Sequence, residues 1–297
     1  MNSVIISVPA SSANIGPGFD SLGLALDLYL TLTVTASEAW KIEQQSDLLP
    51  SFTSYEDHFI YQIAQETANR YGCQLPSCHL TVDSSIPLAR GLGSSASAII
   101  AGIELANQCC QLHLTTAEKL QLATIKEGHP DNVAAALIGG LVITAYTENK
   151  TIDYYKINNI NADMIIFIPN EELKTEASRK ALPEEYLRSQ AANASSIANV
   201  FLAALISKDY DLAGKMMEKD LFHEPYRAKL IANYSDIKQK GKELGVYGTV
   251  ISGAGPTMLS FAPKGQGKTI AAKLQAIFPD YLIQNRKIDM KGLEVTS

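Results

Sequence analysis

The strongest constraint in this sequence is a pair of glycines placed just before a predicted helix, in the segment Pro87–Ala96 (PLARGLGSSA). Gly91 and Gly93 permit backbone angles that turn successive N–H groups toward one anion. The helix that follows presents its unpaired N–H groups and the positive end of its dipole to the same place. Its first carboxylate, Glu104, lies well inside the helix, although helix starts normally favour acidic residues. The pattern predicts a phosphate site, and a Gly/Ser turn that only lets a helix pack closely on a strand is the alternative.

Strands and helices follow one another without strict alternation, which predicts an α+β fold rather than a doubly wound parallel sheet. Apolar periodicity predicts strands at Val4–Val8, Leu22–Thr35, Cys78–Val82, Leu141–Tyr146, Ile165–Ile168, Thr249–Ile251, Met258–Ala262 and Tyr281–Ile288. Helices are predicted at Asp57–Tyr71, Ser94–Cys110, Thr116–Lys126, Asp131–Leu137, in several segments between Glu176 and about Gly245, and at Gly267–Phe278. The chain of 297 residues suits two domains. The polar stretch Thr147–Thr151 predicts their boundary, with domains at 1–150 and 151–297.

Composition excludes several classes of function. The formal charge of −6 disfavours a nucleic-acid partner, since an acidic surface repels phosphodiesters. No apolar run reaches 18 residues, and the N-terminal VIISV reads as a strand, so neither a membrane span nor a signal peptide is expected. The four cysteines form no CxxC pair, which predicts reduced thiols and a cytoplasmic location. The five histidines lie too far apart in the sequence for a dedicated zinc site.

The run Ala262–Thr269 (APKGQGKT) matches a loosened Walker A pattern, with alanine in place of its first glycine. It lies between a predicted strand and a predicted helix, as a P-loop does. A P-loop core needs further parallel strands and an acidic residue downstream. Residues 270–297 suffice for only one helix and one strand, so a solvated turn is the preferred interpretation.

Four motifs resemble those of one enzyme family. Pro87–Ala96 is similar to the nucleotide loop of the GHMP kinases, and ISGAGPTM from Ile251 to Met258 resembles their third motif. The segment VPASSANIGPGFDSLGLAL from Val8 to Leu26 and the segment EGHPDNVA from Glu127 to Ala134 resemble the homoserine kinases more narrowly. The resemblance implies an N-terminal nucleotide-binding α+β domain and a C-terminal ferredoxin-like domain, with the active site between them.

The resemblance also implies roles for individual residues. Nucleotide contacts are expected along the loop, at Pro87, Leu88, Ala89, Arg90, Gly91, Leu92, Gly93, Ser94, Ser95, Ala96 and Ser97. Ser95 and Glu127 are expected to hold Mg²⁺, and Gly253 and Gly255 to lie near the phosphates. Substrate contacts are expected from Asn14, Asp20, His129, Asn132, Arg179 and Arg227, and roles near the reacting phosphate from Thr175 and Asn14.

Taken singly, several of these residues have plainer interpretations. Asp20 is typical of a turn, and His129 of a loop. Arg179 and Arg227 are typical of solvated helix charges paired with Glu176 and Glu224. Two departures from the family are also present. His58 stands where many relatives have an asparagine, which leaves the adenine contacts open. Asp131 is the nearest candidate for a general base, but its expected place as a helix N-cap leaves that role unassigned.

The activity that the resemblance implies is transfer of the ATP γ-phosphoryl group to the hydroxyl of L-homoserine, toward threonine, with ATP and Mg²⁺ as cofactors. Another GHMP kinase, acting on mevalonate or a diphosphocytidyl polyol, is the alternative enzyme. A regulator on the same fold that binds ATP without turnover is the alternative outside catalysis. A small-molecule partner is expected and no nucleic acid or membrane, and a homodimer is kept as a prediction for the assembly.

Overall fold

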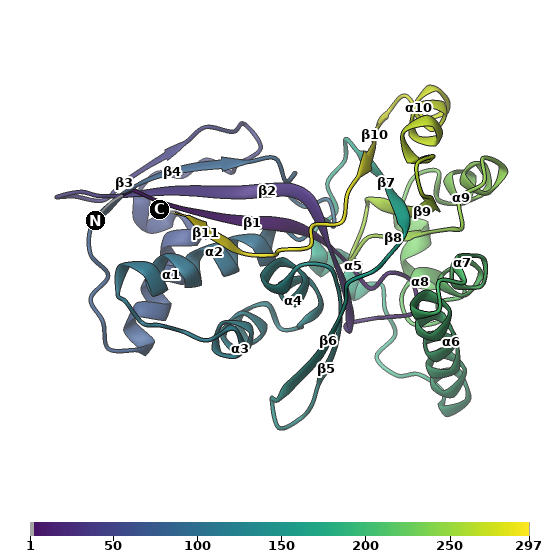
Figure 1. Cartoon of the computed structure of the whole chain (residues 1–297), viewed down its shortest axis with the longest axis horizontal. Helices are drawn as coiled ribbons and strands as arrows, with labels where there is room; N and C mark the ends of the chain where they lie inside the picture. Colours follow the sequence, from purple (N-terminus) through teal and green to yellow (C-terminus); the bar gives the residue numbers. More distant parts are fainter. Residues whose placement is uncertain (1–2, 297) are drawn as a thin grey trace.

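The computed structural model describes residues 3–296 and contains two sheets, each covered by helices (Figure 1). The first has seven strands in the order β11-β1-β2-β4-β3, with β5 paired to β2 and β6 paired to β5. Its strands are β1 (Val4–Ala13), β2 (Leu22–Ala36), β3 (Lys41–Gln44), β4 (Cys78–Ser84), β5 (Leu141–Tyr146), β6 (Ile152–Ile157) and β11 (Glu294–Thr296). Alternate residues of β2 are buried beneath the helices, at Leu28, Leu30, Leu32 and Val34. Period-2 burial of this kind is what the sequence pattern predicts.

The helices of this half cover one face of the seven-stranded sheet (Figure 1). They are α1 (Phe59–Arg70), α2 (Ser94–Cys109), α3 (Thr116–Glu127) and α4 (Asp131–Ile138), preceded by the 3₁₀ turn η1 (Tyr55–Asp57). Helix α2 is buried along most of its length. It packs against β1, α1 and α3, so the loop at its N-terminus is held from several sides.

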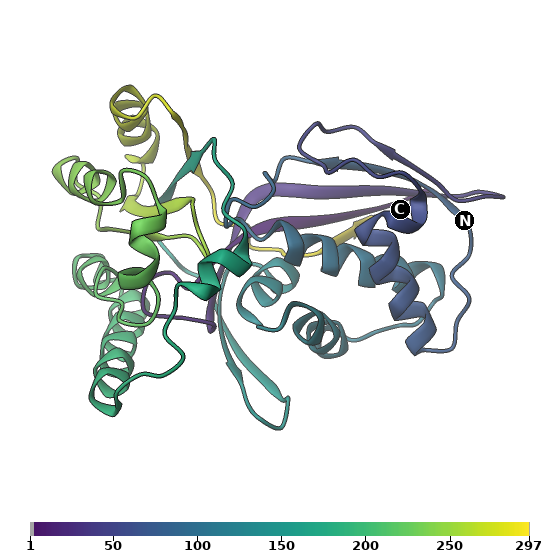
Figure 2. The same ribbon diagram turned by 180° about the vertical axis from the view of Figure 1, so that it is seen from behind.

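The second sheet has four antiparallel strands in the order β10-β7-β9-β8. They are β7 (Ala162–Pro169), β8 (Gly248–Ile251), β9 (Met258–Pro263) and β10 (Tyr281–Arg286). Its longer helices lie on the outer side of the sheet (Figure 2). The helices of this half are α5 (Thr175–Lys180), α6 (Arg188–Ile206), α7 (Tyr210–Met217), α8 (Glu224–Arg227), η2 (Ala228–Leu230), α9 (Tyr234–Glu243) and α10 (Gly267–Ile277). The β-α-β-β-α-β order confirms the ferredoxin-like expectation and the α+β class.

The two halves exchange segments of chain. Strand β11 returns to the first sheet and pairs with β1, while the β1–β2 connection reaches out under α7 and α8 (Figure 1). The stretch Thr147–Thr151 forms the turn of the β5–β6 hairpin, so the first sheet continues past it to Ile157. The division of the chain at residue 150 stays a prediction.

Most expected elements are present with small shifts at their ends, and the differences concern one helix, the last expected strand and three short strands. The expected helix Asp57–Tyr71 is a 3₁₀ turn capped by Ser54 followed by a helix from Phe59. The expected last strand ends at Arg286. Strands β3, β6 and β11 were not predicted, because they are short or polar and depend on partners distant in sequence.

The run Ala262–Thr269, which resembles a Walker A motif, binds a carboxylate of its own chain. Asp163 Oδ2 accepts hydrogen bonds from the N–H groups of Gly265 (2.9 Å) and Gly267 (3.0 Å), and Lys264 pairs with the same carboxylate. The amides that a P-loop would offer to phosphate are therefore used within the fold. Among residues 3–296, no helix is long and apolar enough to cross a membrane.

Candidate active site

The glycine loop forms a tight turn at the start of α2. Gly91 (φ +74°) and Gly93 (φ +67°) both adopt the left-handed backbone region, and Gly93 is the N-cap of the helix. Among the residues that the structure describes, no side chain caps α2, and the first turn of this helix contains no acidic residue. The N–H groups at this end are therefore available to a ligand.

The motif from Ile251 to Met258 packs directly on this loop. Ser252 Oγ donates to the Gly91 carbonyl (2.7 Å), and the Thr257 N–H donates to the Arg90 carbonyl (3.2 Å). A Cβ at residue 91 would lie 2.3 Å from the Ser252 carbonyl oxygen. The fit between the two halves of the chain therefore requires glycine at this position.

We expect Gly91→Ala to raise the KM for ATP by about 10-fold or more, because the new Cβ displaces the loop from Ser252. The left-handed backbone alone costs an alanine about 1–2 kcal/mol of folding free energy. Gly72→Ala is the matched control, since Gly72 has φ +66° with nothing within 4 Å of an added Cβ. Both variants carry the left-handed cost, and Gly91→Ala should lose more stability in thermal unfolding, because only its Cβ meets backbone atoms. Equal KM values for ATP in the two would contradict the loop assignment.

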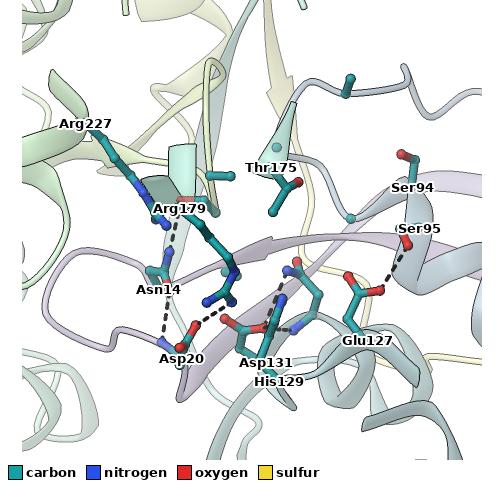
Figure 3. Close-up of a pocket in the computed structure, with 17 residues that line it drawn as sticks. Asn14, Asp20, Ser94, Ser95, Glu127, His129, Asp131, Thr175, Arg179 and Arg227 are labelled. Carbon is teal, nitrogen blue, oxygen red and sulfur yellow. Dashed lines mark hydrogen bonds and ion pairs between the residues drawn. The ribbon is translucent and has the colours of Figure 1, made fainter. Parts of the chain in front are cut away.

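Ser95 and Glu127 lie together beside this loop. Ser95 Oγ donates to Glu127 Oε2 at 2.9 Å, joining the first turn of α2 to the end of α3 (Figure 3). Burial raises the pKa of Glu127, the nearby Asp131 adds to this, and His129, Ser95 and Arg179 oppose it. A partly buried carboxylate that lacks a full counter-charge is a natural partner for a cation.

His129 and Asp131 form a pair next to Glu127. His129 Nδ1 lies 2.5 Å from Asp131 Oδ1, and the same oxygen accepts from the N–H of Asn132 (2.6 Å). Burial alone lowers the pKa of His129, but the hydrogen bond and charge of Asp131, with Glu127 and Asp20, outweigh it and raise this pKa. The expected N-cap role of Asp131 is wrong, because Pro130 takes that place and Asp131 is the first helical residue.

Asn14 and Asp20 come from the β1–β2 connection and face the second half of the chain. Asn14 Oδ1 accepts from the Asp20 N–H (3.1 Å), and Asn14 Nδ2 donates to the Gly253 carbonyl (2.9 Å). Asp20 pairs with Arg179 across the cavity at 3.3 Å. The interpretation of Arg179 as a helix charge paired with Glu176 is wrong, since Lys180 makes that pair.

Arg227 is 2% exposed, which is unusual for this side chain. Its Nη1 donates to the Gly253 carbonyl (3.1 Å) and its Nε to the Ser178 carbonyl (3.4 Å). Burial, and then the charge of Arg179, lower the pKa of Arg227. Glu224 does not pair with it, as it would in the plainer interpretation, but binds Lys238 and Tyr234. The buried Arg227 and the half-exposed Arg179 thus face one cavity, and within residues 3–296 no carboxylate pairs with Arg227.

One cavity collects residues from all four sequence motifs (Figure 3). Its lining includes the expected residues Asn14, Asp20, Ala89, Gly91, Gly93, Ser94, Ser95, Glu127, His129, Asn132, Thr175, Arg179, Arg227 and Gly253. Thr175, the first residue of α5, lies between the arginines and Ser94 (Figure 3). Residues so distant in sequence meet here because the cavity lies between the two halves of the chain.

Other residues that were expected to contact the nucleotide or its phosphates do not line this cavity. Leu92, Ala96 and Ser97 are buried beneath the loop, Gly255 packs near Ile231, and Pro87 is not among the lining residues. The Arg90 guanidinium turns away and donates to the carbonyls of Leu88, Pro169 and Asn170. Any contact of these residues with a nucleotide through the backbone stays a prediction.

A second, largely apolar cavity of about 420 Å³ adjoins the first and shares Ser94 and Ser95 with it. Leu88, Phe52, Ile60 and Ala98 line it, with His58. His58 Nε2 lies 3.4 Å from Gln44 Nε2, and burial lowers the pKa of this histidine, which favours the neutral ring. This cavity has the size and character of a site for a flat heterocycle.

Sequence reasoning missed two serines that hydrogen-bond to residues of the cavity lining. Ser11 Oγ donates to Asn132 Oδ1 (2.9 Å), and Ser178 Oγ donates to the Ala254 carbonyl (2.7 Å). Ser11 lies within the quoted motif, which was its only signal. Ser178 carries no signal of its own, because its partner is 76 residues away.

Family models match both halves of the chain. The model described as the GHMP kinases N terminal domain matches residues 58–140, and the model described as GHMP kinases C terminal matches residues 201–280. The curated homoserine kinase of Oceanobacillus iheyensis is 51% identical over 292 residues, with 98% of each chain covered. The homoserine kinase of Bacillus velezensis is 45% identical, covering 97% of this chain and 93% of its own.

The crystal structure of homoserine kinase from Cytophaga hutchinsonii has a TM-score of 0.83 at 26% identity, covering 100% of this chain and 98% of that one. The likeness therefore extends over both sheets and the cavity between them. The chain belongs to the GHMP kinases and, within them, to the homoserine kinase family.

Proposed function

We propose that this chain transfers the γ-phosphoryl group of ATP to the side-chain hydroxyl of L-homoserine, giving O-phospho-L-homoserine and ADP, a step of threonine biosynthesis. The observation that carries the proposal is one cavity that joins a bare helix N-terminus to groups suited to an amino acid zwitterion. GHMP kinases use ATP as phosphate donor, and the homoserine kinase relatives match nearly the whole chain. The activity and the geometry thus support each other.

On the substrate side, charges of both signs lie within reach of one small molecule. Arg179 and Arg227 suit the carboxylate, because a guanidinium can donate to both oxygens at once. Asp20 suits the ammonium group, and Asn14 lies beside it. In the free enzyme, Asp20 and Arg179 neutralise each other as a half-exposed pair. When the substrate binds, each of the two side chains exchanges this partner for a charged group of the ligand.

On the nucleotide side, the phosphates lie at the start of α2 and the base in the adjoining apolar cavity. The two cavities meet at Ser94 and Ser95, which lets one ligand extend through both. His58 lines the base cavity in place of the asparagine that many relatives carry. The neutral ring offers hydrogen bonding to the base without adding charge.

The residues Ser95 and Glu127 fit a divalent cation. Their oxygens lie 2.9 Å apart, which is about the separation of adjacent oxygens around Mg²⁺ at about 2.1 Å each. When bound, Mg²⁺ neutralises phosphate charge and holds the triphosphate in one geometry. Asp20, His129 and Asp131 also place ligand atoms within 4.8 Å of one another, but they bind Arg179 and each other in the structure.

Catalysis then rests on positioning and charge neutralisation. A loose phosphoryl-transfer transition state needs little covalent help from the protein. Thr175 lies between the two ligand sites, where its hydroxyl can contact the phosphoryl group during transfer. The Asp131 carboxylate is engaged by His129 and Asn132, so we propose that it orients His129 and is not a general base.

The alternatives fit the site less well. Mevalonate has no ammonium group to use Asp20, and a diphosphocytidyl polyol has no carboxylate to use the two arginines. A regulator that binds ATP without turnover would need neither Asp20 nor the arginines in this cavity. A cytoplasmic location and a homodimer stay predictions.

A coupled ADP-release assay with Mg-ATP tests the proposal against L-homoserine, L-serine, L-threonine, mevalonate and galactose. We expect turnover on L-homoserine to exceed turnover on every other substrate by at least about 100-fold. The substrate must place its carboxylate on the two arginines and, at the same time, have a side chain long enough to bring its hydroxyl to the phosphate. Higher activity on another member of the panel would refute the substrate. Measurable ATP binding with silence across the panel would favour the regulator.

A further inference from the structure

The segment Asn14–Asp20, which carries two proposed substrate contacts, has a backbone that cannot hold itself in place. Asn14 (φ 70°), Ile15 (φ 47°) and Asp20 (φ 53°) all occupy the left-handed region without being glycine. This conformation costs about 1–3 kcal/mol at each such residue, and most for a β-branched one. Neighbouring structure must therefore fix the segment.

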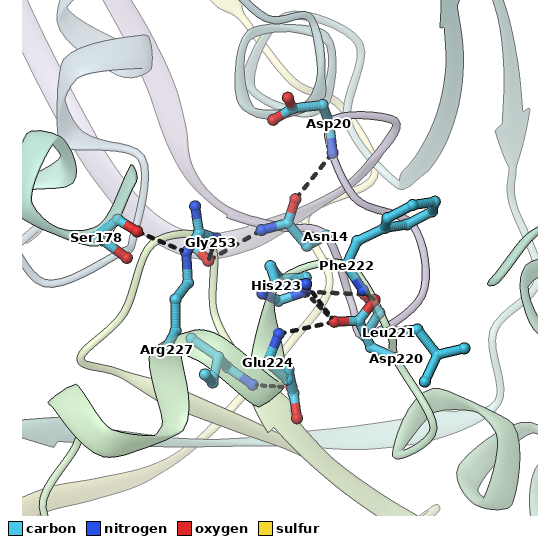
Figure 4. Close-up of polar contacts among 12 residues, drawn as sticks. Asn14, Asp20, Ser178, Asp220, Leu221, Phe222, His223, Glu224, Arg227 and Gly253 are labelled. Atoms are coloured by element: carbon cyan, nitrogen blue, oxygen red, sulfur yellow. Dashed lines mark hydrogen bonds and ion pairs between the residues drawn. The ribbon is translucent and has the colours of Figure 1, made fainter. Parts of the chain in front are cut away.

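The fixing contact comes from the corner before α8 (Figure 4). His223 is fully buried, and its Nε2 lies 3.0 Å from the Gly16 carbonyl oxygen. Because a carbonyl only accepts, the ring carries its proton on Nε2. The same ring stacks on Phe19, with centroids 5.6 Å apart. His223 thus holds both the polar and the apolar side of the segment.

The His223 side chain is in turn held by its own corner. Asp220 Oδ2 accepts from the N–H groups of His223 and Glu224, each at 2.7 Å, and lies 3.6 Å from His223 Nε2. Glu224 Oε1 accepts from the Ile251 N–H at 2.6 Å, which ties the corner to β8. The ring therefore has little freedom to move away from Gly16.

The same corner leads into the carboxylate site. Arg227, four residues after His223, lies with Cζ 5.5 Å from the Phe19 ring centroid. It shares the Gly253 carbonyl with Asn14. A displacement of the segment at Gly16 therefore changes the distance between Asn14 or Asp20 and the arginines.

We propose that His223 is a positioning residue for L-homoserine: its Nε2–H holds Gly16 so that Asn14 and Asp20 face the arginines. The inference rests on the proposed function for the identity of the ligand. It does not place His223 in contact with substrate.

The test compares His223→Leu with His223→Gln. A glutamine amide reaches the position of Nε2 and can donate to Gly16, whereas leucine fills similar space without a donor. We expect His223→Leu to lower kcat/KM for L-homoserine by about 10-fold or more, since small misplacements of binding groups have such effects. The KM for ATP should change by less than about 2-fold, and His223→Gln should recover most of the loss.

If His223→Leu does not fold, His223→Asn replaces it, because the shorter amide cannot reach Gly16. Hydrogen exchange at the Gly18 and Asp20 amides, both bonded to Asn14, gives a readout that needs no substrate. Exchange there should be faster in the Leu or Asn variant and close to wild type in the Gln variant.

Unchanged exchange and unchanged kcat/KM for L-homoserine in the Leu or Asn variant would overturn the inference. So would equal losses in the Gln and Asn variants, or losses for ATP and L-homoserine alike. If the wild-type protein does not turn over L-homoserine, the proposed function fails, and the exchange result still decides whether His223 holds the segment.

Discussion

Glu127→Gln is expected to lower kcat by about 100-fold or more while the protein stays folded. The amide keeps the size and the hydrogen bond to Ser95 but removes the charge that a cation needs. Because burial raises the pKa of this carboxyl, the variant should be at least as stable to thermal unfolding as wild type. Steady-state ADP release across a range of Mg²⁺ concentrations measures the effect.

The matched control is Glu66→Gln, which removes an exposed carboxylate that pairs with Lys126 away from the cavity. Its kcat should equal that of wild type, since exposed pairs contribute little. A Glu127→Gln enzyme with wild-type kcat and an unchanged requirement for Mg²⁺ would show that this residue does not hold the metal.

Arg227→Ala is expected to lower kcat/KM for L-homoserine by about 10³-fold. Hydrogen bonds to a charged group contribute about 1.5–3 kcal/mol each, and a guanidinium makes two with a carboxylate. Arg227→Lys should recover only part of the loss, because the ammonium cannot form both bonds in the same plane. The KM for ATP should change little in either variant, since Arg227 does not line the base cavity.

Arg188→Ala provides the control, because Arg188 is an exposed residue at the start of α6. Thermal unfolding must accompany the kinetics, since Arg227 also binds two backbone carbonyls. A folded Arg227→Ala enzyme with wild-type kcat/KM for L-homoserine would refute the carboxylate assignment.

The sequence predicts the parts of this fold that depend on local patterns. Alternation in β2 and the small-residue surface of α2 each identify an element from neighbouring residues, and both are present close to the expected bounds. The glycines at positions 91 and 93 likewise predict a turn with unusual backbone angles, and both have positive φ. Local chemistry is sufficient in these places because the partner of each residue is a few positions away.

The remaining features depend on contacts between distant segments. Strand β11 forms on the edge that β1 offers, and its three residues are too few to predict a strand by themselves. The pairing of Asp20 with Arg179 joins residues 159 positions apart. Local reasoning assigned Arg179 to its helix neighbour Glu176 and Asp20 to a turn, because it cannot weigh a partner from the other half of the chain.

The position of His223 within the site likewise could not be predicted from local sequence patterns. In the sequence it lies four residues before Arg227, without a motif of its own. Its role depends on Gly16, 207 residues earlier, and on the backbone angles of Ile15. Only the assembled structure brings these together.

The most direct test of the central claim is identification of the product. Wild-type protein incubated with Mg-ATP and L-homoserine should form a phosphomonoester detected by ³¹P NMR, with the mass of O-phospho-L-homoserine and one ADP released per product. Release of inorganic phosphate without this product, or phosphorylation of another alcohol in preference to L-homoserine, would contradict the account.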